Sequence, residues 1–382
     1  MGFHEFSSPY DWSRIAAYKR TAKAAFGGMI DLSVGSPVDP VPDSVRKALA
    51  VAANDPNAYG YPATAGTADL RAAIAEWFSA ARNVDLQAIH ADVVPTVGSK
   101  EGVALMASLL HFGEDDVVVQ PKVSYPTYEI GTQLAGAQVL KVDDVADVAL
   151  WRNVPGVKAV WVNSPCNPTG EVYSAERMAG IVAAAREIGA VVLSDECYAL
   201  MQWRGATNSA DDDPLQSTPC ALRSDVCAGS AEGVLVLYSL SKQSNMAGYR
   251  TAFIAGDESL IASMSAYRKQ IGQIIPGPVQ AAMAAGLRDL ESVKVQHARY
   301  RERLGVLVSA LRAYGYCTDM PDGALYVWVR AKSGDCWTDM EQLAKIGIIA
   351  SPGEFYGAPE CLRFSATASD EAIASAAERL AR

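Results

Sequence analysis

The sequence is poor in the residues that build metal sites and disulfide frameworks, and it has no long apolar run. Its 382 residues include four histidines, none spaced as metal ligands, so we expect no bound metal. Seven cysteines are scattered without a Cys-x-x-Cys pair, which favours reduced thiols in a cytoplasm over disulfides. No stretch approaches the roughly 20 apolar residues that span a bilayer. The segment Met1–Tyr10 lacks the charged start and apolar core of a secretory signal. We therefore expect a cytoplasmic protein without a membrane partner.

Positive charge is scarce as well. The chain has 33 lysines and arginines against 43 aspartates and glutamates, and the formal net charge of -10 disfavours a nucleic-acid partner. Hydrophobic residues make up 50% of the chain and charged residues 20%, proportions typical of a soluble enzyme. The length is enough for one large α/β domain and a smaller one.

Predicted strands and helices alternate through the middle of the chain. Short apolar runs predict strands, and apolar residues at helical spacing predict helices between them. The predicted strands are 93–97, 116–119, 138–140, 157–162, 191–194, 234–238 and 252–255. The predicted helices are 45–53, 67–82, 100–111, 128–134 and 174–189. This order predicts an α/β fold with a mostly parallel sheet, covered on both faces, and ligands beyond the carboxyl ends of the strands.

Three stretches depart from this alternation. The first thirty residues predict an arm or an isolated helix. Residues 205–232, rich in Ser, Asp, Thr and Ala, predict a surface loop or insertion in which the triplet Asp211–Asp213 is solvated. One long helical pattern runs from about Gln280 to Tyr314 and leads into a mixed C-terminal region. We expect an N-terminal arm with part of the small domain (1–44), a large cofactor-binding domain (45–280) and a C-terminal small domain (281–382).

Polar residues follow the predicted strands at the points where a ligand would lie. The run Gly98-Ser-Lys100 opens a helix, whose backbone N–H groups and Ser99 hydroxyl suit an anion, although Ser99 could equally be a simple N-cap. Asn167 stands between prolines in the run Asn163–Gly170, which a structural turn would also explain. A turn, however, does not require an asparagine held rigidly at a strand terminus.

The next two strands end in groups that suit a pyridine ring and an aldehyde. Asp195, in Ser194–Tyr198, can pair with a pyridinium nitrogen and keep the ring cationic, whereas alone it could be a helix cap. Lys242 follows the last of these strands, in Ser239-Leu-Ser-Lys-Gln-Ser-Asn-Met-Ala-Gly-Tyr-Arg250. Its amine can form a Schiff base, while Ser239, Ser241 and Arg250 can donate hydrogen bonds to a phosphate. Together these residues predict a site for pyridoxal phosphate (PLP).

These ordered motifs resemble the class I/II aminotransferases, PLP enzymes of fold type I, and the resemblance covers nearly the whole chain. It implies a PLP-dependent transferase fold with a mostly parallel sheet in the large domain. Lys242 would be the Schiff-base lysine and proton shuttle. Asp195 would pair with the pyridine nitrogen, and Asn167 and Tyr198 would bind the phenolic oxygen of the cofactor, Asn167 also lying against the substrate.

The resemblance assigns roles to the remaining candidates. Tyr125 would stack on the ring, Tyr61 would reach a phosphate across the interface of a homodimer, Gly35 would close over the substrate, and Arg363 would grip its α-carboxylate. The residues that would hold the phosphate are Gly98, Ser99, Lys100, Ser239 and Arg250.

A narrower resemblance concerns the substrate. The runs Leu32–Pro40, Tyr61–Gly66 and Pro352–Gly357 are similar to those of actinobacterial N-succinyldiaminopimelate aminotransferases. This likeness implies transfer between N-succinyl-LL-diaminopimelate and 2-oxoglutarate, with glutamate as amino donor, in lysine biosynthesis. We also weigh an aspartate or aromatic aminotransferase and a PLP carbon–sulfur β-lyase on the same scaffold.

One alternative belongs to another class, the ligand-sensing domain of a transcription regulator. Such a protein would add a DNA-binding domain. About thirty residues precede the predicted fold, fewer than a winged helix needs, and the net charge is acidic. We therefore expect an enzyme.

Overall fold

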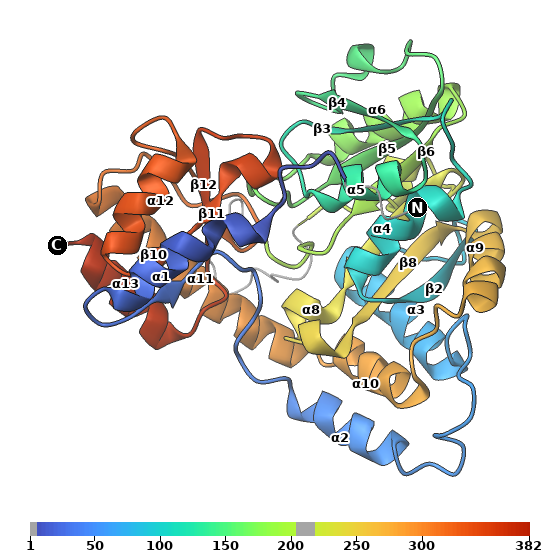
Figure 1. Cartoon of the computed structure of the whole chain (residues 1–382). Coiled ribbons are helices and arrows are strands. Elements are labelled where there is room, and N and C mark those ends of the chain that lie inside the picture. Colours follow the sequence, from blue (N-terminus) through green and yellow to red (C-terminus); the bar gives the residue numbers. More distant parts are fainter. Residues whose placement is uncertain (1–5, 204–217) are drawn as a thin grey trace, which may run out of the picture.

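A mostly parallel sheet of seven strands organises the larger part of the computed structural model, which describes residues 6–203 and 218–382. The strand order is β2-β8-β7-β6-β5-β3-β4, and β8 runs antiparallel to both of its neighbours. The predicted α/β fold with a mostly parallel sheet is confirmed. The strands, seen in Figure 1, are β2 (Ala91–Val97), β3 (Val117–Pro121), β4 (Gln138–Val142), β5 (Val157–Asn163), β6 (Val191–Asp195), β7 (Val234–Ser239) and β8 (Thr251–Asp257).

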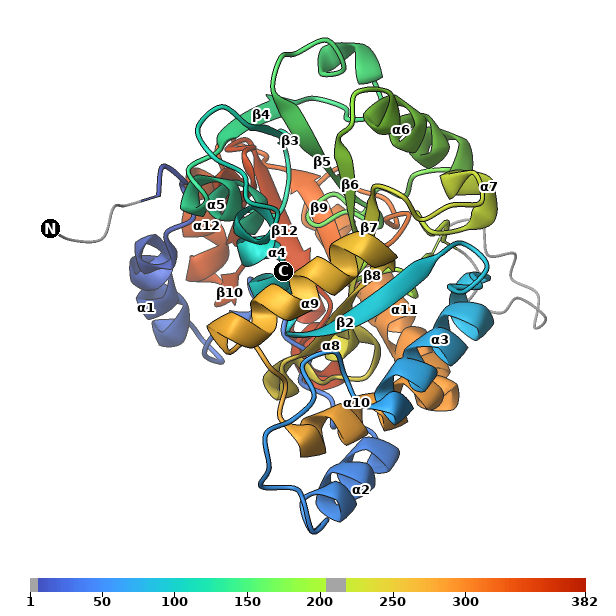
Figure 2. The ribbon, with the colours of Figure 1, turned by 90° about the vertical axis from the view of Figure 1, so that its right-hand side faces the viewer.

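Helices cover both faces of this sheet (Figures 1 and 2). One face packs against α4 (Ser99–Leu109), α5 (Thr127–Leu134) and α9 (Glu258–Ile271). The other packs against α3 (Ala68–Arg82), α6 (Ala175–Glu187) and α10 (Gly277–Arg288), and α2 (Asp43–Ala52) packs on α10. None of the helices in the described residues is long and apolar enough to cross a membrane.

The apolar strand sequences follow from this double cover. Neighbouring residues of a strand point to opposite faces. In β5, Val160 and Val162 belong to the core under α3, α6 and α10, whereas Trp161 packs with Tyr128 on the opposite side. Because both faces of the sheet are buried, the middle of a strand can be apolar throughout instead of alternating with polar residues.

A second core lies beside the large sheet. It unites the N-terminal region with the C-terminal region, because Ile15 and Ile30 are buried in the same cluster as residues beyond 300. Its strands are β1 (Ile30–Asp31) paired with β10 (Ile348–Ile349), and the antiparallel set β11 (Ser351–Pro352), β12 (Cys361–Ser365) and β9 (Tyr326–Arg330). Its helices are α1 (Ala16–Ala24), α11 (Leu290–Ala313), α12 (Cys336–Lys345) and α13 (Asp370–Leu380). The domain boundaries at residues 44 and 280 stay a prediction.

For the N-terminal residues we expected an arm or an isolated helix, and the helix that forms there is not isolated. Figure 1 shows α1 lying against the second unit. Ile15 is 1% exposed and Ala22 is fully buried there, so apolar burial holds this segment in place.

The single helix expected from Gln280 to Tyr314 is also wrong, because the chain breaks it at Asp289. α10 ends at Arg288 and α11 begins at Leu290. The Asp289 carboxylate accepts a 3.1 Å hydrogen bond from the backbone N–H of Ser292 and so caps the second helix.

The predicted surface loop at 205–232 is wrong in its described part. Residues 204–217, with the triplet Asp211–Asp213, lie outside the described residues. From Thr218 onward the chain packs inward, with Leu222 and Cys227 fully buried and a short helix, α7 (Ser224–Cys227), against α6.

A buried ion pair holds this segment against the end of β6. Nη2 of Arg82, in the last turn of α3, donates to Oε2 of Glu196 at 2.9 Å, and both side chains are almost completely buried. Arg82 also donates to the hydroxyl of Thr218 at 2.6 Å and to the carbonyl of Pro219 at 3.0 Å. The remaining oxygen of Glu196 accepts from the backbone N–H of Ala221 at 2.8 Å. These charges are paired, so their burial is tolerated.

We expect Arg82→Met to lower the free energy of unfolding by about 3–5 kcal/mol, because it leaves the charge of the buried Glu196 carboxylate without its counter-charge. Arg288→Met is a matched control, since Arg288 pairs with Asp69 and Glu76 at the surface, with 39% of its side chain exposed. That change should cost less than about 1 kcal/mol. Urea denaturation measures both, and equal losses would contradict the role of burial.

Candidate active site

The residues that follow β2, β5, β6 and β7 meet at one edge of the central sheet. These four strands run in the same direction, so their carboxyl ends lie together. A cavity of about 360 Å³ opens there. The predicted site residues that line it are Gly35, Ser99, Lys100, Tyr125, Asn167, Asp195, Tyr198, Ser239, Lys242, Arg250 and Arg363.

Two predicted residues do not line the cavity. Gly98 lies directly behind it, because a Cβ atom at this position would be 2.2 Å from Nη2 of Arg250. Tyr61 is fully exposed on this chain. Its contact across a dimer interface stays a prediction.

One end of the cavity gathers donors suited to an anion. α4 begins at Ser99, and its N-cap, Gly98, has no side chain, so a ligand can take the first backbone N–H groups of the helix. The Ser239 hydroxyl lies 2.7 Å from that of Ser241, and the Arg250 guanidinium completes the group. Hydroxyls, a helix start and a guanidinium together suit a phosphate.

Lys242 projects its amine into the middle of the cavity. It lies on α8 (Leu240–Gln243), immediately after β7, and its Nζ donates to the backbone carbonyl of Gly35. Burial, with help from the nearby guanidinium of Arg363, lowers the pKa of this amine. A lowered pKa increases the neutral fraction at neutral pH, and only the neutral amine can accept a proton.

Asp195 forms the floor of the cavity at the end of β6. Its Oδ2 accepts a 2.8 Å hydrogen bond from the hydroxyl of Tyr128, and its Oδ1 accepts from the backbone N–H of Cys197 at 3.1 Å. Burial raises the pKa of Asp195, and the hydrogen bond from Tyr128 opposes that rise. A cationic ring nitrogen beside it would favour the carboxylate form.

Arg363 reaches the cavity from β12 of the second unit. Its Nη1 donates to Oδ1 of Asn167 at 2.7 Å, and its Nη2 donates to the carbonyl of Ser33 at 2.8 Å. The rings of Tyr326 and Tyr356 lie 3.9 Å and 4.8 Å from the guanidinium carbon. Its buried Nε has no hydrogen-bond partner, and its Nη atoms bind an amide and a carbonyl rather than a carboxylate of the described residues. The arrangement is suited to a carboxylate ligand.

Several tyrosines at the cavity were not predicted. The hydroxyls of Tyr326 and of the predicted Tyr198 share a 2.6 Å hydrogen bond, in which either can be the donor. The Nζ of Lys100 lies over the ring of Tyr10, 5.3 Å from the ring centroid. Other lining residues that we missed are Trp12, Cys197 and Tyr356. Tyr10 and Trp12 come from the N-terminal arm, for which the sequence carries no strand-end signal.

A lysine between an anion site and a buried carboxylate is typical of enzymes that bind an aldehyde cofactor. Residues 27–380 match the family "Aminotransferase class I and II", and the chain therefore belongs to this family of PLP-dependent enzymes. Enzymes of this family act on amino acids and oxo acids. Among the described residues, no group of three His, Cys, Asp or Glu side chains could hold a metal ion.

Known proteins resemble the chain over nearly its whole length. The 4-dedimethylamino-4-oxo-anhydrotetracycline transaminase OxyQ of Streptomyces rimosus is 40% identical and covers 97% of this chain and 98% of its own. The "probable aminotransferase Rv1178" of Mycobacterium tuberculosis is also 40% identical, over 97% and 84%. A solved "probable N-succinyldiaminopimelate aminotransferase" from Thermus thermophilus has a TM-score of 0.84 and 27% identity, over 97% and 99%.

The residues present fit PLP. The missing side chain at Gly98 leaves room for the Arg250 guanidinium at the anion site, and the Lys242 amine and the Asp195 carboxylate line the same cavity. When bound, PLP withdraws electrons from the α-carbon of an amino acid.

We expect Gly98→Ala to weaken PLP binding by about tenfold or more, because the new methyl group displaces the Arg250 guanidinium. Gly136→Ala is the matched control. Gly136 also has a positive φ, 79°, but its new methyl group meets no atom within 4 Å. Titration of the apoenzyme with PLP measures both, and equal weakening would contradict the steric account.

Proposed function

We propose that the enzyme is a succinyldiaminopimelate transaminase, which transfers an amino group between N-succinyl-LL-diaminopimelate and 2-oxoglutarate in diaminopimelate and lysine biosynthesis. The observation that best supports an amino-acid substrate is the buried guanidinium of Arg363. It pairs with no carboxylate in the described part of the chain and shares the cavity of the Lys242 amine. The particular acyl substrate is supported by the likeness to the Thermus thermophilus protein. We place the reaction in the cytoplasm.

Each site residue then has a defined task. Arg363 binds the α-carboxylate, and Nζ of Lys242 takes the proton from the α-carbon of the substrate. Asp195 holds a proton at the ring nitrogen of the cofactor, and Asn167 and Tyr198 bind its phenolic oxygen.

The enclosure of the site supports these tasks. Asn167 and Asp195 are each 6% exposed, and Tyr198 is 7% exposed, so their hydrogen bonds act with little competition from water. Tyr125 lies on the wall of the cavity and would stack on the ring. Ser99, Ser239 and the other anion-binding groups would hold the phosphate at the far end.

One relative gives a reason to test a second acceptor. OxyQ, at 40% identity, is named for an oxo group on an anhydrotetracycline. The second candidate function is therefore amination of a cyclic ketone.

The decisive experiment supplies purified holoenzyme with N-succinyl-LL-diaminopimelate and 2-oxoglutarate and follows glutamate formation. We expect kcat/KM to exceed that for aspartate or an aromatic amino acid by about tenfold or more. Faster amination of 4-dedimethylamino-4-oxo-anhydrotetracycline from glutamate would favour the second candidate. Pyruvate and ammonia from cystathionine without an oxo acid would instead show a β-lyase.

We also propose a homodimer in which Tyr61 completes the partner's site. Tyr61→Phe should weaken PLP binding about tenfold through the loss of one hydrogen bond to phosphate, although this side chain is fully exposed on a single chain. Tyr59→Phe is the matched control, because Tyr59 lies two residues away and is 90% exposed. Titration of each apoenzyme variant with PLP, at protein concentrations at which the dimer forms, measures the two affinities. Equal affinities for the two variants, or an active monomer in sedimentation, would contradict the assignment.

A further inference from the structure

A segment without regular structure crosses the opening of the active site. It runs from Leu32 to Pro40, between β1 and α2, and we call it the strap. Leu32 and Ser33 are fully buried, but from Val34 onward no apolar side chain of the strap is buried. Val34 is 46% exposed and Val38 is 58% exposed. Apolar packing therefore contributes little to the position of this part, which depends on its polar contacts.

The middle of the strap forms one wall of the substrate cavity. The carbonyl of Ser33 accepts from Arg363, and the carbonyl of Gly35 accepts from Lys242. The carbonyl of Val34 accepts a 3.1 Å hydrogen bond from the hydroxyl of Thr367. The two groups that would meet the substrate carboxylate and its α-proton thus touch the strap directly.

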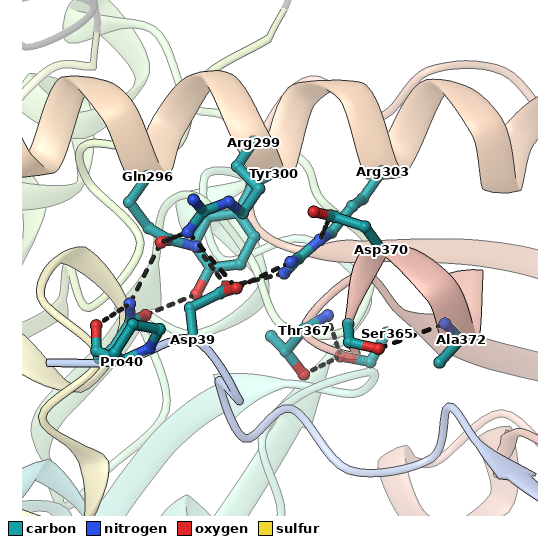
Figure 3. Close-up of polar contacts among 12 residues, drawn as sticks. Asp39, Pro40, Gln296, Arg299, Tyr300, Arg303, Ser365, Thr367, Asp370 and Ala372 are labelled. Atoms are coloured by element: carbon teal, nitrogen blue, oxygen red, sulfur yellow. Dashed lines mark hydrogen bonds and ion pairs between the residues drawn. The ribbon is translucent and has the colours of Figure 1, made fainter. Parts of the chain in front are cut away.

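The far end of the strap is fastened by Asp39 (Figure 3). Its two carboxylate oxygens accept hydrogen bonds from Nη1 and Nη2 of Arg303 at 2.7 and 2.8 Å, and Oδ2 also accepts from Nε2 of Gln296 at 2.8 Å. Arg299 lies 3.4 Å from Oδ1. The Asp39 side chain is 10% exposed and that of Arg303 is 3% exposed, so this bidentate ion pair is largely shielded from water.

The same cluster reaches the segment that carries the catalytic lysine. Nδ2 of Asn245, three residues after Lys242, donates to Oε1 of Gln296 at 3.1 Å and to the carbonyl of Pro40 at 3.3 Å. The hydroxyl of Tyr300 donates to Oδ1 of Asn245 at 3.1 Å. Figure 3 shows Gln296, Tyr300 and Arg303 on the side of α11 that faces Asp39 and Pro40. One helix therefore fixes the end of the strap and the lysine segment with respect to each other.

We propose that Asp39 is a positioning residue for the substrate site: through Arg303 and Gln296 it holds the strap so that Val34 and Gly35 form the wall facing Lys242 and Arg363. The inference depends on aminotransferase activity and not on the acyl substrate proposed above.

This role separates substrate binding from cofactor binding. The anion-binding residues Ser99, Ser239 and Arg250 have no hydrogen bond to the strap in the described part of the chain. A released strap should therefore weaken amino-acid binding and leave PLP affinity nearly unchanged. A change that merely destabilised the fold would affect both.

The test compares Asp39→Asn with Asp370→Asn. Asp370 is a matched control because it accepts a 2.6 Å hydrogen bond from Nε of the same Arg303 guanidinium, and within the described residues it has no hydrogen bond to the strap. The amino donor is the one that the wild-type holoenzyme uses best. We expect Asp39→Asn to raise KM about ten- to a hundredfold, with a smaller change in kcat and a PLP dissociation constant within about twofold of wild type. Asp370→Asn should leave KM within about twofold.

A second measurement follows the strap itself. Hydrogen–deuterium exchange at residues 34–39 should be faster in the holoenzyme of Asp39→Asn than in wild type or Asp370→Asn. Equal KM values for the two variants, or parallel losses of substrate and PLP affinity, would overturn the proposal. If Asp39→Asn does not fold, Gln296→Met replaces it, since it removes the hydrogen bonds of Gln296 with Asp39 and Asn245 and keeps the ion pair of Asp39 with Arg303. A smaller rise in KM is then expected, and an unchanged KM would overturn the role.

Discussion

The hydrogen bond from Arg363 to Asn167 joins the two halves of this enzyme at the cavity where the chemistry takes place. Arg363 belongs to the second core through β12, and Asn167 follows β5 of the large sheet. A guanidinium that is 4% exposed requires compensation for its lost hydration. Asn167, the carbonyl of Ser33 and two tyrosine rings supply part of it. An incoming carboxylate would supply the rest, which is why we regard this residue as the centre of substrate recognition.

The central sheet provides the other half of the arrangement. Parallel strands place the residues at their carboxyl ends on one edge, so Ser99, Asn167, Asp195 and Lys242 meet although about 140 residues separate the first from the last. Burial then sets their chemistry, lowering the pKa of the amine and raising that of the carboxyl. The strap, fixed by Asp39, closes the remaining side against the second core.

The sequence predicted best what periodicity and strand ends encode. The strands of the central sheet follow from apolar runs that are buried on both faces, and the end of one such run predicted the position of Lys242. Tyr10, Trp12 and Tyr326 were missed because they reach the cavity through tertiary packing of distant segments. The break at Asp289 was hidden inside a continuous helical pattern, and the packing of residues 218–227 depends on Arg82, which lies far away in sequence. The contacts of Arg82 with this segment are long-range and leave no local pattern, whereas the Asp289 cap is a local contact that the apolar periodicity did not reveal.

The account is tested most directly by the first half of the reaction, measured by stopped flow from the change in holoenzyme absorbance. Glutamate and 4-aminobutyrate, which differ by the α-carboxylate alone, are compared in wild type and in Arg363→Lys. If Arg363 binds this carboxylate as a planar pair of donors, wild type prefers glutamate strongly, and the variant loses most of that preference by reacting more slowly with glutamate. An unchanged ratio of the two rate constants in Arg363→Lys would contradict the central claim.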